Sequence, residues 1–132
     1  MILFKTERQE AEWPDIAGKL KQLVELLNIY MHLKYNIDPM VTELMRTQEE
    51  QDDIYGKKAD KATRDKYKKK PWQSVHQYGR GADIRTHDWE RNQVKDALFI
   101  LNTIVYDPKR PRKKTAIHHN IGTGEHIHIQ VM

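Results

Sequence analysis

Hydrophobic residues recur at helical spacing between residues 15 and 36. Within this segment, apolar side chains three or four positions apart form one stripe: Leu20, Leu23, Val24, Leu27 and Met31. Such a stripe predicts an amphipathic helix with one buried face. Pro14 suits the first turn, where no N–H is needed for helical hydrogen bonding. The helix is expected to end before Asp38-Pro39, because the residue before a proline avoids helical backbone.

Two further helices are predicted downstream. Residues 89–106 keep the helical period, and we expect Asp88 to cap this helix. Its apolar positions are Val94, Ala97, Leu98, Leu101 and Val105. A shorter helix is expected to begin at Thr47, because Glu50 three residues later completes the pattern of a capping box. Gly56 is expected to close it.

Short apolar or alternating runs predict strands at 40–45, 81–87, 115–120 and 125–132. The last two are expected to pair as a hairpin through residues 121–124, and residues 57–73 are expected to form a long loop with at most one helical turn. Helices mixed with short strands in this order predict an α+β fold. We therefore expect a small single domain over residues 1–132, with a short antiparallel sheet flanked by helices.

Composition narrows the function classes. The chain is 38% hydrophobic and 32% charged, and it has no cysteine but seven histidines. Disulfides are therefore excluded, and a metal site would have to use imidazole and carboxylate ligands. No apolar run is long enough to span a membrane, and the first ten residues do not resemble a secretory signal. We expect synthesis in the cytoplasm without a signal peptide.

Basic residues gather in two segments. Residues 57–70 hold eight and residues 109–114 hold five of the 23 lysines and arginines, in a chain of net charge +4. Such blocks are typical of solvated surface, and they can also contact an anionic polymer.

His76, Asp83 and His128 are the candidate metal ligands. Two imidazoles and one carboxylate, with water at the fourth position, form a known catalytic zinc arrangement. Glu125 lies three residues before His128, where a carboxylate could accept a proton from water at the metal. Positions 125 and 128 of a straight strand point to opposite faces, so we expect a bend at Gly124 to direct Glu125 inward.

The remaining histidines of the C-terminal segments are given a simpler interpretation. His118 and His119 are interpreted as ordinary surface residues of a strand. His126 shares a strand face with His128, and only one of the two is expected to point at the metal.

Two stretches resemble a known family. Residues 74–83, "SVHQYGRGAD", resemble the pattern S-x-H-x-x-G-x-A-x-D, and "EHIHIQV" at 125–131 resembles its C-terminal strand, in which an acidic residue lies three before the last ligand. The family is the zinc D-alanyl-D-alanine carboxypeptidase group, which includes vancomycin-resistance dipeptidases, phage L-alanyl-D-glutamate endolysins and the hedgehog signalling domain. The resemblance implies that His76, Asp83 and His128 bind Zn²⁺ and that Glu125 is the general base.

A third stretch extends the resemblance. "VTELMRTQEEQ" at 41–51 matches the segment in which the family has an arginine after its first core strand. By this resemblance Arg46 would bind substrate and stabilise developing negative charge, and Ser74 would support the ligands from behind. Two departures are visible: the family's "SGYR" is "ELMR" here, and its C-terminal E-x-W-H form is "EHIH".

The resemblance implies a zinc metallopeptidase that hydrolyses stem peptides of bacterial peptidoglycan. Either D,D-carboxypeptidase or L-alanyl-D-glutamate-type endopeptidase activity fits, and a phage or prophage lysis enzyme that acts on the cell wall after release is a further hypothesis. Anionic wall polymers are expected as additional partners of the basic segments.

Two alternatives stay open. One is a non-catalytic zinc-binding module of the same fold, which would not need Glu125 or Arg46. The other is a nucleic-acid-binding protein that uses the basic segments. It is less favoured, because the basic segments lack the interleaved aromatic residues expected for stacking on bases, and Tyr67 and Trp72 beside the first segment could equally line a substrate cleft.

Overall fold

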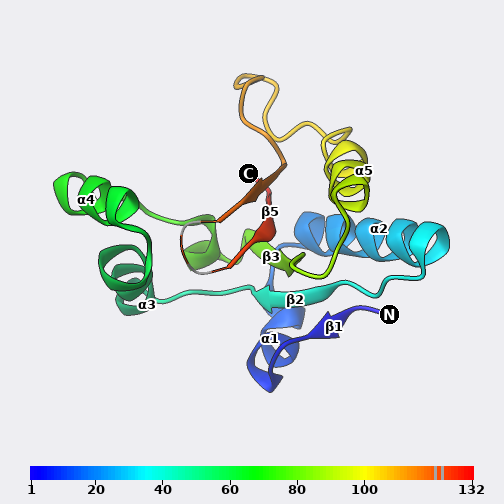
Figure 1. Ribbon diagram of the computed structural model, residues 1–132, viewed down its shortest axis with the longest axis horizontal. Helices are drawn as coiled ribbons and strands as arrows, with labels where there is room; N and C mark the ends of the chain where they lie inside the picture. The colour runs from blue at the N-terminus through cyan, green and yellow to red at the C-terminus, as the bar shows by residue number, and fades with distance from the viewer. Residues whose placement is uncertain (121, 123) are drawn as a thin grey trace.

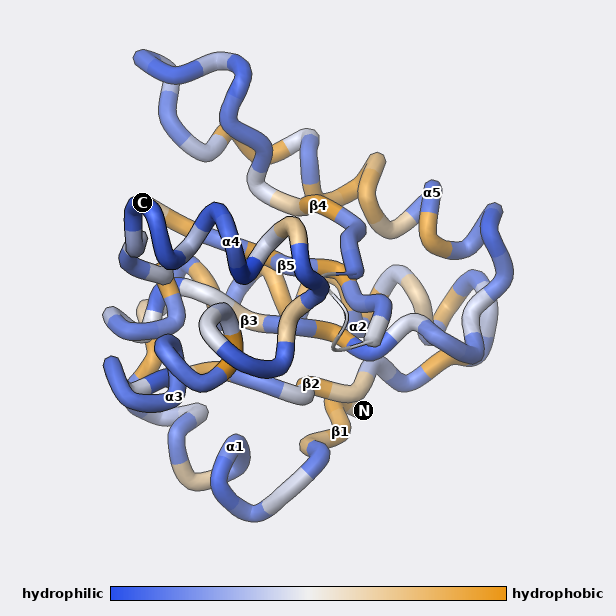
Figure 2. Tube along the Cα trace, turned by 60° about the vertical axis from the view of Figure 1, so that its left-hand side comes forward, coloured by the Kyte–Doolittle hydropathy of each residue, from blue (hydrophilic) through white to orange (hydrophobic). Residues whose placement is uncertain are grey.

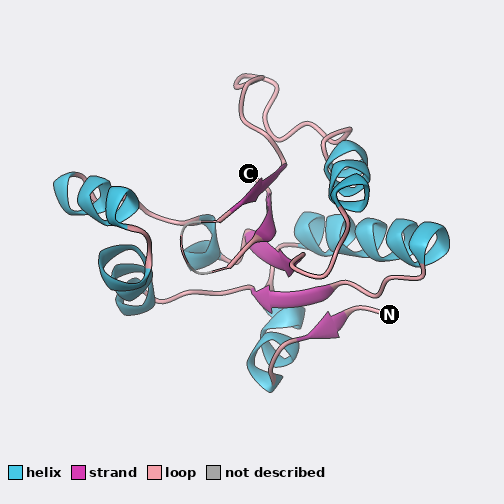
Figure 3. Cartoon of the chain, in the orientation of Figure 1, coloured by secondary structure: helices cyan, strands magenta, loops and turns pink. Residues whose placement is uncertain are grey.

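A five-stranded mixed sheet lies at the centre of the computed structural model, which describes residues 1–120, 122 and 124–132 (Figure 1). The strands follow the order β1 (Leu3–Phe4), β2 (Met40–Glu43), β3 (Gly81–Arg85), β5 (His126–Gln130) and β4 (Ala116–His119). β1 is parallel to β2, and the other neighbours are antiparallel. The helices are α1 (Glu7–Glu12), α2 (Gly18–Tyr35), α3 (Gln48–Asp53), α4 (Lys61–Lys69) and α5 (Arg91–Leu101). Figure 3 shows this mixture of helices and strands, and the predicted α+β fold is confirmed.

The core lies between the sheet and two helices, α2 and α5, which pack against each other. Alternate residues of β3 and β5 face these helices, including Ile84, Ile127 and Ile129, all fully buried. The predicted stripe of α2 is buried against them, from Leu20 to Met31. Figure 2 shows hydrophobic segments along the strands and hydrophilic ones along α3 and α4. Within the described residues, no helix is both long and apolar enough to cross a membrane.

The two long helices begin later than predicted. Pro14 belongs to a separate 3₁₀ turn, η1 (Trp13–Asp15), and Ile16 then adopts extended backbone before α2 starts at Gly18. α2 ends at Tyr35, and its C-cap Asn36 takes a left-handed conformation with φ of 53° before Asp38-Pro39. α5 covers only the middle of 89–106. Its cap is Glu90, not Asp88, because Glu90 and Gln93 form a capping box.

The helix predicted at Thr47 is confirmed, together with its capping box to Glu50. The expected stop at Gly56 is wrong, because the chain continues through Gly56 in a π-helical turn, η2 (Ile54–Lys58). A glycine can lie inside such a turn, and its helix-ending effect depends on a left-handed conformation that Gly56 does not adopt.

Residues 61–69 form a helix, α4, where a loop was expected. Asp60 caps it by accepting a hydrogen bond from the Thr63 N–H at 2.9 Å. Tyr67 anchors the helix, with its ring centroid 5.5 Å from that of Tyr55 and 4.8 Å from that of Trp72. One buried aromatic residue is enough to attach this short helix, and a single apolar position gives no detectable helical period in the sequence.

The four predicted strands are present, each somewhat shorter than expected, and β4 and β5 pair antiparallel as predicted. Residues 121 and 123 of the predicted hairpin connection lie outside the described residues. β1 and α1 were not predicted. A strand of two residues is too short for alternation to be visible, and it forms because β2 offers its edge.

Gly122 gives a stability prediction. Its φ is 94°, and a Cβ atom there would lie 2.8 Å from the backbone nitrogen of Asp60. We therefore expect Gly122→Ala to lower the free energy of unfolding by about 1–3 kcal/mol, measured by denaturant titration. Gly56→Ala is the matched control, because a Cβ atom there would meet nothing within 4 Å. Equal stabilities of the two variants would contradict this explanation.

Candidate metal centre

The three predicted ligands come from three neighbouring elements. Asp83 in β3 and His128 in β5 are directly paired across the sheet, so their side chains lie on the same face. His76 belongs to a 3₁₀ turn, η3 (Val75–Tyr78), that precedes β3. Gly79 reverses the chain with φ of 67° and brings His76 over the sheet. A glycine makes this reversal because it enters the left-handed region without steric cost.

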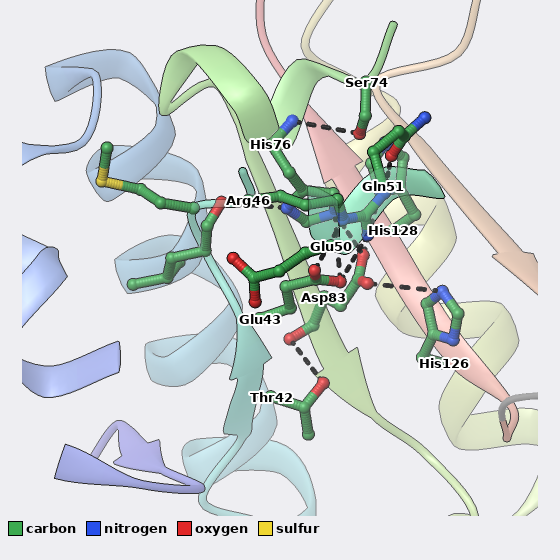
Figure 4. Close-up of polar contacts among 12 residues, drawn as sticks. Thr42, Glu43, Arg46, Glu50, Gln51, Ser74, His76, Asp83, His126 and His128 are labelled. Atoms are coloured by element: carbon green, nitrogen blue, oxygen red, sulfur yellow. Dashed lines mark hydrogen bonds and ion pairs between the residues drawn. The ribbon is translucent and has the colours of Figure 1, made fainter. Parts of the chain in front are cut away.

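The ligands converge on one carboxylate oxygen (Figure 4). Asp83 Oδ1 lies 3.1 Å from His76 Nε2 and 2.9 Å from His128 Nδ1. The donor atoms of all three residues lie within 4.8 Å of one another. His76 and Asp83 are buried, with 1% and 6% of their surface exposed. The structure therefore brings the three residues together into a group that could hold a metal ion.

The hydrogen bonds behind the imidazoles determine where their protons lie. His76 Nδ1 is 2.9 Å from the Leu44 carbonyl oxygen, which can only accept, so Nδ1 carries the proton. Gln130 donates its amide N–H to the Lys114 carbonyl, which directs Gln130 Oε1 toward His128 Nε2 at 3.3 Å. In their neutral forms, both imidazoles therefore present an unprotonated nitrogen to the same carboxylate oxygen. Such converging lone pairs need a cation among them.

A proton on His76 is favoured while no metal is present. Burial lowers the pKa of His76, whereas the charge and the hydrogen bond of Asp83 raise it, and the net effect is a rise. Burial raises the pKa of Asp83, but His76 and His128 outweigh burial and hold that pKa well below its usual range. A charged pair at a buried position costs desolvation free energy unless it is well paired, so the site is suited to exchange its protons for a metal ion.

Residues at the start of the ligand motif support the site. The Ser74 hydroxyl oxygen accepts a hydrogen bond from the His76 backbone N–H at 3.2 Å, which caps η3. Gly81 is a further departure from the resembled pattern, which has alanine at this position. A Cβ atom there would lie 2.7 Å from Val75 Cγ2 and 3.2 Å from His76 Nδ1. Glycine at this position leaves room for the His76 ring.

A β-bulge places Glu43 beside the ligands. Val41 of β2 pairs with Ile84, and Glu43 pairs with Asp83, so β2 carries one extra residue between these pairs. A bulge redirects the side chains that follow it. Glu43 Oε2 consequently lies 4.0 Å from His76 Nε2. The position of Glu43 depends on strand pairing, which the sequence does not reveal.

Arg46 lies at the site but is already paired. Its Nε and one terminal nitrogen donate to the two carboxylate oxygens of Glu43, and its other terminal nitrogen donates to Gln51 Oε1 at 2.6 Å. The Arg46 side chain is only 4% exposed. Each terminal nitrogen keeps a second N–H. Arg46 therefore lines the pocket with Glu43 as an ionic partner that the resemblance does not include, and its role toward substrate stays a prediction.

Glu125 is not brought to the ligands. β5 begins at His126, and Glu125 shares the sheet face of Ile127 and Ile129, opposite to His128. Its Oε1 accepts a hydrogen bond from the Thr86 hydroxyl at 3.4 Å and lies 3.4 Å from His118 Nε2. The expected inward bend at Gly124 is therefore not observed, and the role of Glu125 as general base stays a prediction.

His119 and His126 lie in the pocket, contrary to the surface position expected for His119. They are paired across β4 and β5, with 2.9 Å between their Nε2 atoms. Burial and the neighbouring His126 lower the pKa of His119 to about 4, so it is neutral at pH 7. The signal in the sequence was the alternation of His126 with His128, but the partner of His126 depends on the hairpin register.

The ligands open onto a pocket of about 620 Å³. Its walls come from α1, α3, η2 and the C-terminal strands, and include Arg8, Tyr55, Trp72, Lys58 and Lys113. A pocket of this size is typical of small-molecule or peptide sites.

One wall of the pocket gives a pH prediction. Arg8 donates to both carboxylate oxygens of Glu50, at 2.5 and 2.7 Å, and ties α1 to α3. These hydrogen bonds lower the pKa of Glu50 from 4.5 to about 2. The ionised pair therefore stabilises the fold above pH 4.5, and this stability is lost as the pH falls toward 2.

We expect Arg8→Ala to cost about 1 kcal/mol or less at pH 7, a small value because Glu50 is 37% exposed. The stability difference from the parent should shrink near pH 2. The free energy of unfolding at both pH values measures this effect, with the exposed Arg91→Ala as control. An equal difference at both pH values would disprove the assignment.

Comparison of the chain with protein-family models, with curated proteins and with solved structures gives no match. The family resemblance therefore rests on the three motifs and on the ligand geometry described above.

Proposed function

We propose that this protein is a zinc-dependent peptidase that hydrolyses stem peptides of bacterial peptidoglycan. The observation that carries the proposal is the convergence of His76, Asp83 and His128 at the floor of an open pocket. Their arrangement matches the motif order of the zinc D-alanyl-D-alanine carboxypeptidase group, from which the substrate class is taken.

The residues fit a zinc ion. Zinc prefers nitrogen and carboxylate ligands at about 2.0–2.2 Å, and ligand atoms on one tetrahedral ion then lie about 3.3 Å apart. The separations of 3.1 and 2.9 Å from Asp83 Oδ1 are close to this value. The Leu44 carbonyl and Gln130 hold both imidazoles in the tautomers that ligation requires. When bound, zinc would act as a Lewis acid and lower the pKa of its water to about 7.

We assign proton transfer to Glu43. Asp83 would be a ligand, and Glu50, within the described part of the chain, pairs with Arg8 and makes no ion-pair contact with a ligand imidazole. Glu43 is the remaining carboxylate of the pocket lining, and its Oε2 is near the ligand set. Glu43 would accept the proton of the attacking water and return it to the leaving amine. Arg46 would hold Glu43 in position and offer its free N–H groups to the substrate carbonyl.

The two basic segments suggest anionic wall polymers as an additional partner. Lys58 of the first segment and Lys113 of the second both line the pocket, so they would attract carboxylates of the peptide and anionic wall polymers. Because the substrate lies in the cell wall, we propose that the protein acts there after release.

Digestion of purified peptidoglycan, with and without a chelator, tests the proposal. We expect new peptide termini by mass spectrometry that disappear when metal is removed and return when Zn²⁺ is added. Zinc binding without new termini on any peptidoglycan would instead support a non-catalytic module. Metal-independent binding to nucleic acid, with a steep salt dependence, would support the basic-protein alternative.

A further inference from the structure

The pocket contains a second set of metal-ligand atoms beside the first. His119 and His126 face each other across β4 and β5, and their Nε2 atoms are 2.9 Å apart. His126 Nε2 also lies 3.6 Å from Asp83 Oδ2, as Figure 4 shows. The other oxygen, Asp83 Oδ1, contacts His76 and His128. The two oxygens of the Asp83 carboxylate thus lie beside different histidines: Oδ1 beside His76 and His128, and Oδ2 beside His126, which pairs with His119.

Hydrogen bonding again fixes a tautomer. His126 Nδ1 is 3.1 Å from the Gly124 carbonyl oxygen, which can only accept, so the proton lies on Nδ1. His126 Nε2 therefore presents a lone pair to both Asp83 Oδ2 and His119 Nε2. A hydrogen bond donated by His119 would explain the His119–His126 contact alone. A cation between the three residues would explain the contact of His126 with Asp83 as well.

The two separations around His126 Nε2 suit a shared ion. Ligand atoms on a tetrahedral ion with bonds of about 2.0–2.1 Å lie about 3.3 Å apart. The observed separations of 2.9 and 3.6 Å lie on either side of this value. His126 and Asp83 are also largely shielded, with side-chain exposures of 14% and 9%, so water competes poorly for these atoms.

We infer that His119 Nε2, His126 Nε2 and Asp83 Oδ2 form a second zinc position, and that Asp83 bridges it to the position formed by His76, Asp83 and His128. The inference rests on the metal site of the proposed function and adds a second ion to it. Paired ions about 3.5–4 Å apart can stabilise the attacking and the leaving groups together. The protein would then be a two-metal hydrolase.

Zinc titration of the metal-free protein tests this inference, with a chromophoric chelator as competitor. We expect two equivalents bound by the parent and one by His119→Ala. His119 is the residue to change, because its Nε2 meets His126 Nε2 at 2.9 Å, whereas its ring centroid is 6.0 Å from that of the ligand His128. His118→Ala is the matched control: it is the adjacent histidine of β4, on the opposite face, and should keep two equivalents. Circular dichroism and melting curves establish that each variant is folded.

X-ray absorption at the zinc edge provides a second measurement. We expect metal–metal scattering at about 3.5–4 Å in the parent and its loss in His119→Ala. Saturation of the parent at one equivalent, or the same stoichiometry in His119→Ala and the parent, would overturn the second position and leave the proposed function intact. Absence of tight zinc binding in the parent would overturn both.

Discussion

Asp83→Asn is expected to abolish metal-dependent hydrolysis and to weaken zinc binding by at least about 10²-fold. The change removes the negative charge that two imidazole nitrogens share, at 3.1 and 2.9 Å, while keeping the size of the side chain. Loss of a group that only orients a ligand already costs about 10–100-fold in metal affinity, and the proposed function makes Asp83 a ligand itself. If Asp83 bridges two ions, both are lost together.

Stability provides an independent measure of the same change. A metal that binds only the folded chain stabilises it by about 2.7 kcal/mol at a concentration one hundred times its Kd. Adding a chelator should therefore lower the melting temperature of the parent and leave that of Asp83→Asn unchanged. Asp88→Asn, an exposed residue of the same charge five positions away, should behave like the parent. A chelator-sensitive melting temperature in Asp83→Asn would refute the ligand assignment.

The sequence predicted that His76, Asp83 and His128 come together, because local spacing determines much of their geometry. His76 and Asp83 are joined by a short turn that Gly79 permits, and His128 belongs to a strand whose alternation is plain in the sequence. The buried face of α2 was predictable for the same reason, since helical period is a local property.

Residues whose place depends on strand register were missed. Glu43 reaches the site through a bulge opposite β3, and His119 reaches it through its pairing with His126. Neither strand pairing can be recognised from the residues that neighbour Glu43 or His119 in the sequence. α4 was not predicted because Tyr67 is its one buried residue, and a single buried position gives no helical period in the sequence. Glu125 was expected in the pocket on the basis of the resemblance, whereas the two-residue period of the strand puts it on the other face.

Glu43→Gln is expected to reduce kcat/KM by about 10²–10⁴-fold, the usual contribution of a general base. Glutamine keeps an oxygen that can accept from Arg46 but cannot take a proton from water. Zinc stoichiometry and affinity should stay close to those of the parent, because Glu43 Oε2 is 4.0 Å from His76 Nε2 and is no ligand.

Glu125→Gln is the decisive counterpart, because it makes the same chemical change at the carboxylate that the family resemblance implies. With Glu125 bound to Thr86 and close to His118 on the opposite face, we expect kcat/KM within about threefold of the parent, well below the effect of removing a general base. The opposite result, an inactive and folded Glu125→Gln with its zinc in place beside an active Glu43→Gln, would return the base to Glu125. It would also require the segment before β5 to turn toward the pocket during catalysis. The pair of variants therefore separates a base placed by the β2 bulge from one placed by the start of β5.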